Sequence, residues 1–380
     1  MKIGVIGGGA AGFYAAIQAK EGNDMAHIIL FEKSSKLLSK VRISGGGRCN
    51  VTNGSEDIEA LAAAYPRGQR LMKRALWQFS TVHIKAWFED HGVKLYTQDD
   101  GRVFPVSDDS RSIIDALLKA ADALSIEIRT SSAIEKIEKN DGFILSGSKV
   151  NEKVDKVIVA SGGSPKIEGL QWLKHLGHKI EPPVPSLFTF NMPDESVTSL
   201  PGVSVQKADV TIVGSKWSAN GPLLITHWGM SGPAILKLSA FAARDLAQYH
   251  YRFKLKVNWT GGFSQLEVKS QLLALISSDQ AKTLSALKVF DLPKRLWSYL
   301  LDKTGLEERK PCAELGQKSI NRLVEVLTND QYEVNGKTTF KEEFVTCGGV
   351  SLKSIDWKTM ESKVVPGMYF AGEVLDIDGV

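Results

Sequence analysis

The residues best suited to do chemistry lie close to the N-terminus, where the chain reads Gly7-Gly8-Gly9-Ala10-Ala11-Gly12 and Glu32 follows twenty positions after Gly12. In a Gly-x-Gly-x-x-Gly pattern, Gly7 permits a tight turn, Gly9 lets the backbone approach a pyrophosphate, and Gly12 lets a helix pack closely on a strand. Glu32 can accept hydrogen bonds from both hydroxyls of an adenosine ribose. The spacing predicts a dinucleotide site. The alternative is a glycine-rich turn with a structural role only.

The elements around this loop have to place it at the end of a strand. An apolar run ends at Ile6, the stretch Phe13–Ala19 has helical character, and a second apolar run, Ile28–Phe31, ends in Glu32. The N-terminus of the helix offers free N–H groups and a partial positive charge to phosphates. Strand, glycine loop, helix, strand and acid therefore occur in the order that a dinucleotide-binding unit requires.

A second glycine cluster follows soon after Glu32. Three consecutive glycines favour neither helix nor strand, and they suit a loop whose amides face a ligand at close range. Arg48 can pair with a phosphate or with an electron-rich ring edge. The alternative is a mobile surface loop. The residues that we expect to contact a cofactor here are Ser44, Gly45, Gly46, Gly47, Arg48, Cys49 and Asn50.

Three further side chains have groups that suit catalysis or substrate binding. His227 lies in a Gly/Ser-rich stretch and is suited to proton transfer near neutral pH, with a structural histidine as the alternative. Cys49 follows Arg48, which favours a thiolate; the alternative is a packing role, since no partner cysteine is near in sequence. Arg102 either holds a substrate carboxylate or pairs with an acid. The candidate substrate residues are Arg102, Thr226, His227 and Ser231.

Apolar and turn patterns predict the organisation of the chain. The pattern from Leu71 to His91 is helical, and the apolar run Val157–Ala160 is typical of a buried parallel strand. This run ends at Ser161–Ser164, where we expect the backbone to contact a ligand at the carboxyl end of the strand. The stiff segment Pro182–Pro185 indicates a domain crossing. Strand character is expected to return at Phe340–Val345.

These patterns predict an α/β protein in which a Rossmann-like domain is interrupted by an inserted α+β domain. We expect residues 1–188 and 339–380 to form the two parts of the first domain. We expect residues 189–338 to form the inserted substrate domain, with a strand-rich part at 189–260 and a helical part at 261–330.

Composition argues against several classes of function. The net charge of +4 is small for 380 residues, and no Lys/Arg run indicates a nucleic-acid partner. No apolar stretch approaches the ~20 residues that span a bilayer, and the early first strand leaves no room for a signal peptide. The three cysteines are far apart and form no CxxC, so we expect neither a metal site nor a dithiol pair. A reduced, cytoplasmic location fits best.

Near the C-terminus, an apolar strand followed by Ala371-Gly372-Glu373 resembles the second flavin signature of FAD-dependent oxidoreductases. More narrowly, ISGGGRCNVTN, GRVFPVSD, THWGMSGPAILKLS and CGGVSLKSID with TMESKVVPGMYFAGEVLDIDG resemble a family of bacterial NAD(P)/FAD-dependent flavoproteins, described as BaiN-like or aminoacetone-oxidase-like. The resemblance spans nearly the whole chain. It implies FAD, an inserted domain with a barrel-like and a helical part, and redox chemistry on a small organic molecule.

The resemblance also assigns roles to residues. It implies that Glu373 contacts the ribityl chain of FAD and that the loop around His227 faces the flavin. It further implies that the final motif continues beyond Val380 into further glycines and a helix, so we expect the C-terminal part to be truncated. The remaining cofactor contacts that we expect are Ala11, Lys33, Ile134, Ala160, Ser161, Gly162, Gly372 and Asp376.

We expect an FAD-dependent oxidoreductase that transfers hydride between flavin and a small organic substrate, with NAD(P)H or oxygen as the second redox partner. The chain has no second Gly-x-Gly-x-x-Gly and no CxxxxC. NAD(P)H is therefore expected to visit the flavin transiently. A flavin-binding redox sensor without turnover is an alternative. A tRNA-modifying flavoprotein is a weaker one, because it needs a basic surface for RNA.

Overall fold

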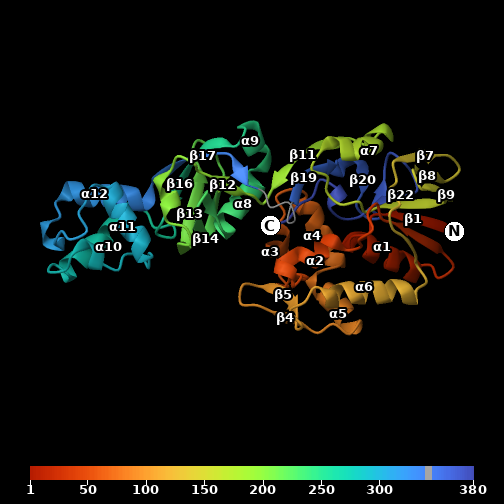
Figure 1. Cartoon of the computed structure of the whole chain (residues 1–380), viewed down its shortest axis with the longest axis horizontal. Helices are drawn as coiled ribbons and strands as arrows, with labels where there is room; N and C mark the ends of the chain where they lie inside the picture. Colours follow the sequence, from red (N-terminus) through yellow and green to blue (C-terminus); the bar gives the residue numbers. More distant parts are fainter. Residues whose placement is uncertain (339–344) are drawn as a thin grey trace. The chain divides into compact units, whose positions relative to one another are not determined.

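The computed structural model describes residues 1–338 and 345–380 (Figure 1). The chain divides into two compact units, Met1–Pro185 with Lys341–Val380, and Ser186–Phe340. The strand expected at Phe340–Val345 lies outside the described residues except for Val345, which begins β19 (Val345–Val350). The two units are described separately.

The first unit is built on a seven-stranded sheet. Its order is β20-β21-β22-β10-β1-β2-β6, and the neighbouring strands from β22 to β6 are parallel. The strands are β1 (Lys2–Ile6), β2 (His27–Phe31), β6 (Glu127–Arg129), β10 (Lys156–Val159), β20 (Ile355–Asp356), β21 (Glu361–Ser362) and β22 (Met368–Phe370). The central position of β1 places the first glycine loop at the carboxyl edge of this sheet, where open α/β sheets bind ligands.

Both faces of the parallel sheet are covered, which explains the near-continuous apolar strands. Val5 and Leu30 share one core with α1 (Ala10–Glu21) and α6 (Arg111–Ala123), which lie together on one face (Figure 1). Ile6 and Phe31 point to the other face and share a second core with Phe143. That core includes residues of the antiparallel sheet β7 (Lys136–Lys139), β8 (Phe143–Gly147) and β9 (Val150–Val154), and of α7 (Gln171–His175).

The connection between β2 and α6 carries the second glycine cluster. It comprises α2 (Ser39–Ile43), η1 (Ser44–Gly47), β3 (Thr52–Asn53), α3 (Ile58–Ala63), α4 (Gln69–Gln78), α5 (Thr81–Asp90), β4 (Leu95–Thr97) and β5 (Arg102–Pro105). The helical pattern expected over Leu71–His91 is confirmed by α4 and α5, which are separated by a break where the chain leaves helical geometry at Phe79. Ser80 then starts α5 through a capping box with His83, and such a cap favours a new helix over a continuous one.

The described C-terminal residues pack on the connection between α3 and α4. Arg67 and Asp378 form a bidentate ion pair whose side chains are 11% and 0% exposed. The N–H of Val380 donates to the carbonyl of Ala64 at 2.9 Å. Pro182–Pro185 lies within β11 (Ile180–Ser186), which pairs with β19, so this stiff segment is a strand of the first unit that ends where the second unit begins.

The second unit contains an antiparallel sheet in the order β17-β16-β13-β14-β15-β12-β18. Only Gly336 separates β17 from β18, so one continuous stretch supplies both edges and the sheet closes on itself. The expected barrel-like part is confirmed. Its strands are β12 (Thr189–Asn191), β13 (Ser204–Ile212), β14 (Ser218–Thr226), β15 (Gly229–Ser231), β16 (Arg252–Asn258), β17 (Asp330–Asn335) and β18 (Lys337–Thr338), accompanied by α8 (Pro233–Phe241) and α9 (Ala243–Gln248).

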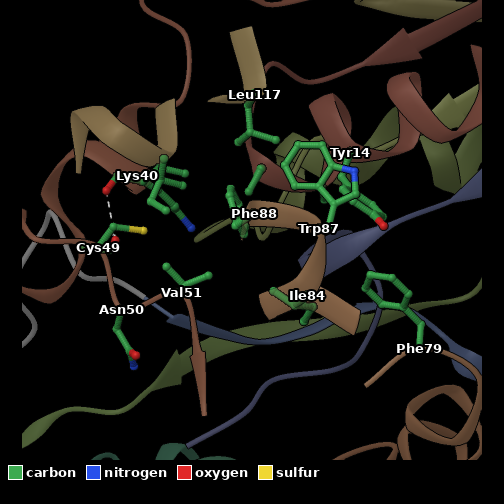
Figure 2. Close-up of a pocket in the computed structure, with 15 residues that line it drawn as sticks. Tyr14, Lys40, Cys49, Asn50, Val51, Phe79, Ile84, Trp87, Phe88 and Leu117 are labelled. Carbon is green, nitrogen blue, oxygen red and sulfur yellow. Dashed lines mark hydrogen bonds between the residues drawn. The ribbon is translucent and has the colours of Figure 1, made fainter. Parts of the chain in front are cut away.

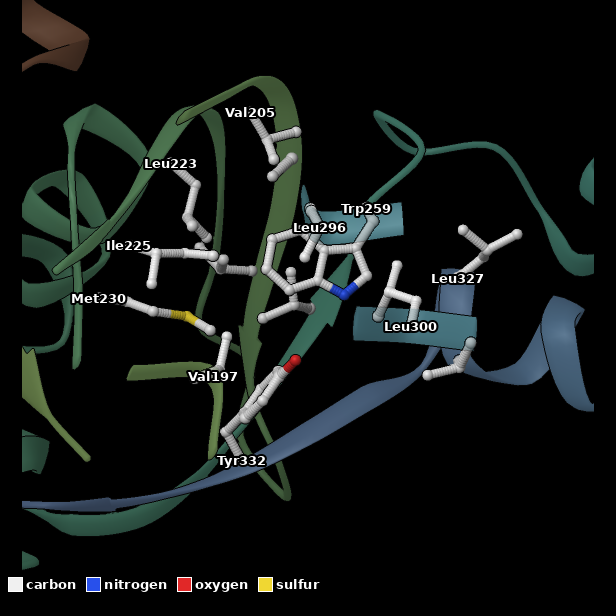
Figure 3. Packing of buried hydrophobic residues seen from close by; sticks show 14 of the residues in the cluster. Val197, Val205, Leu223, Ile225, Met230, Trp259, Leu296, Leu300, Leu327 and Tyr332 are labelled. Atoms are coloured by element: carbon white, nitrogen blue, oxygen red, sulfur yellow. The ribbon is translucent and has the colours of Figure 1, made fainter. Parts of the chain in front are cut away.

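The expected helical part is also confirmed, with α10 (Gln265–Ser278), α11 (Lys294–Lys303) and α12 (Gln317–Thr328). Its apolar side chains join those of the barrel in one core (Figure 3). The buried carboxylate of Asp330 links the two parts, because it accepts a hydrogen bond from the Trp259 indole at 2.9 Å and pairs with Lys303 of α11 at 2.5 Å. Asp330 also accepts from the hydroxyl of Tyr332, so this carboxylate has several donors that offset its burial.

Candidate cofactor site

The first glycine loop has the close approaches that its spacing predicts. A Cβ on Gly12 would lie 1.8 Å from the carbonyl oxygen of Gly7, so only glycine allows α1 to pack this closely on the loop. Gly7 has φ +116°, and a Cβ there would lie 2.3 Å from the carbonyl oxygen of Ala160. A Cβ on Gly9 would meet nothing within 4 Å. Gly7 and Gly12 therefore fix the turn, and Gly9 faces open space where a ligand can approach.

The N-terminus of α1 opens onto this space. Gly9 is the N-cap residue, no side chain caps the helix, and the first turn contains no acidic residue. The leading N–H groups of a helix carry a partial positive charge and bind anions. A pyrophosphate therefore fits this helix end.

Glu32 is held in place by backbone amides from both sides of the loop. Its Oε2 accepts from the N–H of Gly8 and its Oε1 accepts from the N–H of Ser34, both at 2.8 Å. The main chain of Glu32 is fixed as well, because its N–H donates to Arg129 and its carbonyl accepts from Ser132. Each carboxylate oxygen still has a lone pair for a ribose hydroxyl.

A groove of about 450 Å³ joins this loop to distant parts of the first unit. It brings together β1 and α1, the end of β2, the turn after β10, and η7 (Gly372–Val374) near the C-terminus. The structure therefore assembles the N-terminal glycine loop and the Ala-Gly-Glu signature into one site. The predicted cofactor residues that line the groove are Gly7, Gly9, Ala11, Glu32, Lys33, Ala160, Ser161, Gly162, Gly372 and Glu373.

Cationic side chains line the same groove. Lys36 and Lys40 accompany Lys33 along it, and the ammonium of Lys40 lies 3.2 Å from Oε2 of Glu373. Both partners are partly exposed, at 62% and 39%, so this ion pair contributes little to stability. The lysines match the negative charge of a pyrophosphate.

A buried hydroxyl lies directly behind the groove. Thr346 of β19 is 2% exposed, and its Oγ1 has no hydrogen-bond partner among the residues that the structure describes. A Cβ on Gly163, which lines the groove, would lie 3.1 Å from that oxygen. Buried hydroxyls normally have a partner. The open Gly9 and the uncapped helix end together fit a dinucleotide such as FAD.

The second glycine cluster folds into the tight turn η1, away from the groove. Gly45, Gly46 and Gly47 all have positive φ, at +57°, +69° and +87°. The guanidinium of Arg48 lies 4.1 Å from the centre of the Phe104 ring and 3.8 Å from Asp108. The predicted residues Ser44, Cys49 and Asn50 line a separate, apolar cavity (Figure 2).

The structure disfavours a thiolate at Cys49 and favours the packing role that the sequence left open. Cys49 is 6% exposed, and burial raises the pKa of its thiol, with a smaller opposing effect from the hydrogen bond to Ser44. Desolvation disfavours the charged form. Arg48, its neighbour in sequence, is engaged with Phe104 and Asp108. Cys49 therefore keeps its proton at neutral pH.

Two other predicted cofactor residues lie outside the groove lining. Ile134 packs against the core that β7, β8 and β9 share with the parallel sheet. Asp376 is 7% exposed, and its main-chain N–H donates to the carbonyl of Val350 at 3.0 Å. Gly12 acts through packing, as described above.

The predicted substrate residues belong to both units. Arg102 lies in the first unit, where its Nε donates to Asp100 at 2.8 Å, so the expected alternative of pairing with an acid is what the structure shows. Thr226 and Ser231 belong to the hairpin of β14 and β15, and the hydroxyl of Thr226 donates to the carbonyl of Gly229 at 3.1 Å. His227 is exposed in that turn, and its ring lies 4.4 Å from the Trp228 ring in an edge-on arrangement.

Sequence reasoning missed part of the groove. Lys36 and Lys40 both precede the second glycine cluster in the chain, and a cationic residue close to a glycine loop is a usable signal for phosphate binding. Thr346 had no such signal, because its unpaired hydroxyl is a property of tertiary packing. Over the residues that the structure describes, no group of three or more His, Cys, Asp or Glu could hold a metal ion. The same residues contain no helix both long and apolar enough to cross a bilayer.

A parallel sheet with this glycine loop, an acid at the end of the second strand and a C-terminal Gly-Glu returning to the same groove defines the class of FAD-dependent oxidoreductases. The chain belongs to the HI0933-like family, since the profile described as "HI0933-like protein Rossmann domain" matches residues 1–380. The resemblance to BaiN-like flavoproteins is thereby confirmed.

Several relatives match over nearly their whole length. The ribosomal RNA dihydrouridine synthase of Haemophilus influenzae is 28% identical over 396 residues, covering 99% of this chain and 92% of the relative. A protein of the same name in Escherichia coli is 27% identical over 394 residues, covering 99% and 92%. The 3-dehydro-bile acid delta(4,6)-reductase of Clostridium scindens is 25% identical over 389 residues, covering 100% and 94%.

Proposed function

We propose that this chain is an FAD-dependent reductase that saturates a carbon–carbon double bond conjugated to a carbonyl group. The names of its relatives support this chemistry. A dihydrouridine synthase saturates the double bond of a uracil ring, and a delta(4,6)-reductase acts on double bonds of a 3-oxo steroid. In both cases the double bond is conjugated to a carbonyl, which makes the distal carbon an acceptor for hydride.

The cofactor groove is the observation that carries the proposal. The groove offers an uncapped helix end, the carboxylates of Glu32 and Glu373, and lysines along one site. When bound, FAD supplies the hydride chemistry, with NAD(P)H as the reductant. The sequence contains one Gly-x-Gly-x-x-Gly loop, so the proposal includes a transient visit of NAD(P)H without a dedicated domain.

The reaction also needs a proton. The π bond of the substrate breaks, the carbon distal to the carbonyl receives hydride, and the carbon next to the carbonyl receives a proton. Cys49 carries a proton at neutral pH because burial raises the pKa of its thiol. His227 is exposed in the turn between β14 and β15 and is the residue that the sequence predicts for proton transfer. Cys49→Ser and His227→Asn distinguish them, because loss of the true donor slows reoxidation of reduced flavin and leaves its reduction unchanged.

The test is an anaerobic redox titration of the FAD-reconstituted protein. NADPH or NADH should bleach the visible flavin band, and 2-cyclohexen-1-one should restore it with formation of cyclohexanone. Bleaching without reoxidation by either this enone or a uridine-containing RNA would contradict the proposal and favour a redox sensor.

A second candidate substrate is a uracil base within ribosomal RNA. Two relatives that are ribosomal RNA dihydrouridine synthases match over 99% of the chain. Ser186–Phe340 contains 18 Lys and Arg against 14 Asp and Glu, so the whole formal charge of +4 belongs to this unit. A basic unit suits a phosphate backbone. Binding of a ribosomal RNA transcript that weakens steeply with salt, together with reoxidation of reduced flavin by that transcript, would favour RNA over a small enone.

A further inference from the structure

The helix α4 carries exposed cationic side chains that lie outside the lining of the cofactor groove. Its sequence contains Arg70, Lys73 and Arg74 and no acidic residue. Lys73 pairs with Glu59 of α3. Arg70 and Arg74 are exposed, and over the residues that the structure describes neither guanidinium has an ion pair or a hydrogen bond. Two positive charges are therefore available to a partner.

An exposed aromatic ring lies on the same helix. Trp77 is 70% exposed, although tryptophan is usually largely buried. In the part of the chain that the structure describes, its ring contacts no other aromatic ring and has no cation over it. Packing in the core therefore does not account for this side chain, and the indole can stack on a planar group from outside the chain.

The three side chains lie on one side of α4. Residues separated by four and by seven positions in a helix fall within an arc of about 60°. Along the axis, Arg74 lies about 6 Å from Arg70, and Trp77 follows about 4.5 Å further on. We call Arg70, Arg74 and Trp77 the α4 stripe. The sequence shows no run of Lys and Arg here, because one helical turn separates the two arginines.

A hollow of about 480 Å³ lies beside the two arginines. Among the described residues, no carboxylate side chain lines it. A guanidinium offers parallel N–H donors that fit the oxygens of a phosphate. The hollow therefore suits a phosphate group. The residues that line it are Gly68, Gln69, Arg70, Leu71 and Arg74.

Guanidinium groups beside an exposed indole match the chemistry of a single-stranded nucleic acid. The phosphates of such a strand pair with arginines, and its unpaired bases stack on aromatic rings. In a duplex the bases stack on one another, so they cannot stack on Trp77. An acidic protein surface supplies carboxylates for the arginines but no regularly spaced planar group for the indole.

We propose that the α4 stripe binds single-stranded RNA, with Arg70 and Arg74 on its phosphates and Trp77 against an unpaired base. The inference rests on the RNA substrate proposed above, and it deepens that proposal by naming a surface that holds the strand. The three residues bind the strand and take no part in the transfer of hydride or proton.

Fluorescence anisotropy with the FAD-saturated full chain and a labelled 12-nucleotide oligouridylate tests the α4 stripe. Trp77→Ala should weaken binding by about 5- to 150-fold, the contribution of one stacked base. Trp77→Phe keeps a ring and should lose less. Arg70→Ala combined with Arg74→Ala should lower the slope of log Kd against log salt by about 1.4, since each phosphate contact to a single strand contributes about 0.7.

Lys94→Ala combined with Lys119→Ala is the matched control. Both lysines are exposed in the first unit, line a different hollow and have no ion pair among the described residues. The control removes the same charge from another surface, so it should leave the affinity and the salt slope unchanged. Equal losses in the lysine and arginine variants would overturn the proposal, because they would reflect overall charge.

Unchanged oligouridylate binding in Trp77→Ala and in the double arginine variant would also overturn it. So would binding to phosphatidylserine vesicles that depends on Trp77, in the absence of oligouridylate binding. Reoxidation of reduced flavin by 2-cyclohexen-1-one tests the reductase function separately and should proceed at the wild-type rate in every variant. Enone turnover without oligouridylate binding refutes the α4 stripe alone. Stripe-dependent binding without reoxidation by either the enone or RNA refutes the proposed function and supports the stripe.

Discussion

Replacing Glu32 by glutamine tests the role of the ribose-binding acid. The carboxylate accepts two backbone hydrogen bonds at 2.8 Å, from Gly8 and Ser34. A glutamine side chain keeps one acceptor oxygen and turns an NH₂ group toward the other N–H. Hydrogen bonds to charged groups are worth about 1.5–3 kcal/mol. Loss of one therefore lowers the free energy of unfolding of the apoprotein by about that amount.

The same substitution removes the charged acceptor for the ribose. A loss of about 1.5–3 kcal/mol corresponds to an increase of about 10- to 150-fold in the Kd for FAD. The assay is a titration of apoprotein with FAD, followed by flavin fluorescence, beside urea unfolding of the apoprotein. Glu89→Gln on the exposed face of α5 is the control. A Kd changed by less than about twofold, with the expected loss of stability, would show that Glu32 only supports the loop.

Further substitutions probe three other contacts of the first unit. Arg67→Met or Asp378→Asn removes one member of this buried ion pair, so each should lower the free energy of unfolding in urea by about 3–5 kcal/mol, and the double variant by less than the sum. Burial lowers the pKa of His178 below its ordinary value of 6.5. Protonation then favours the unfolded chain, so stability should fall as pH drops below about 6.5, and His178→Gln should reduce this slope. Lys40→Met removes the exposed pair with Glu373 and should change stability by less than about 1 kcal/mol, while it weakens FAD binding in a salt-dependent manner.

The sequence predicted those parts of the site that rest on backbone geometry. A Cβ at Gly7 or at Gly12 would collide with main-chain atoms, so only glycine fits at either position. The spacing of these two glycines alone therefore indicates the turn. Glu32 directly follows β2, which runs parallel to β1. The end of β2 therefore lies beside the glycine loop that follows β1. Glu373 was found through resemblance to a flavin signature, and the structure places it in the same groove.

Features that depend on tertiary packing were not predictable in this way. Arg48 neighbours Cys49 in the chain, yet its guanidinium packs on Phe104, and burial decides the protonation of the thiol. The break at Phe79 depends on a cap that competes with a continuous helical pattern. The unpaired hydroxyl of Thr346 and the apolar cavity beside the groove have no counterpart in residue spacing.

The central claim is that the groove around Glu32 and Glu373 binds FAD for reduction of a conjugated double bond. Anaerobic visible spectroscopy of the FAD-reconstituted protein tests it most directly. We expect bleaching by NADPH or NADH and recovery of the oxidised spectrum on addition of 2-cyclohexen-1-one or a ribosomal RNA transcript. A protein that cannot be reconstituted with FAD, or whose reduced flavin persists in the presence of both acceptors, would contradict it.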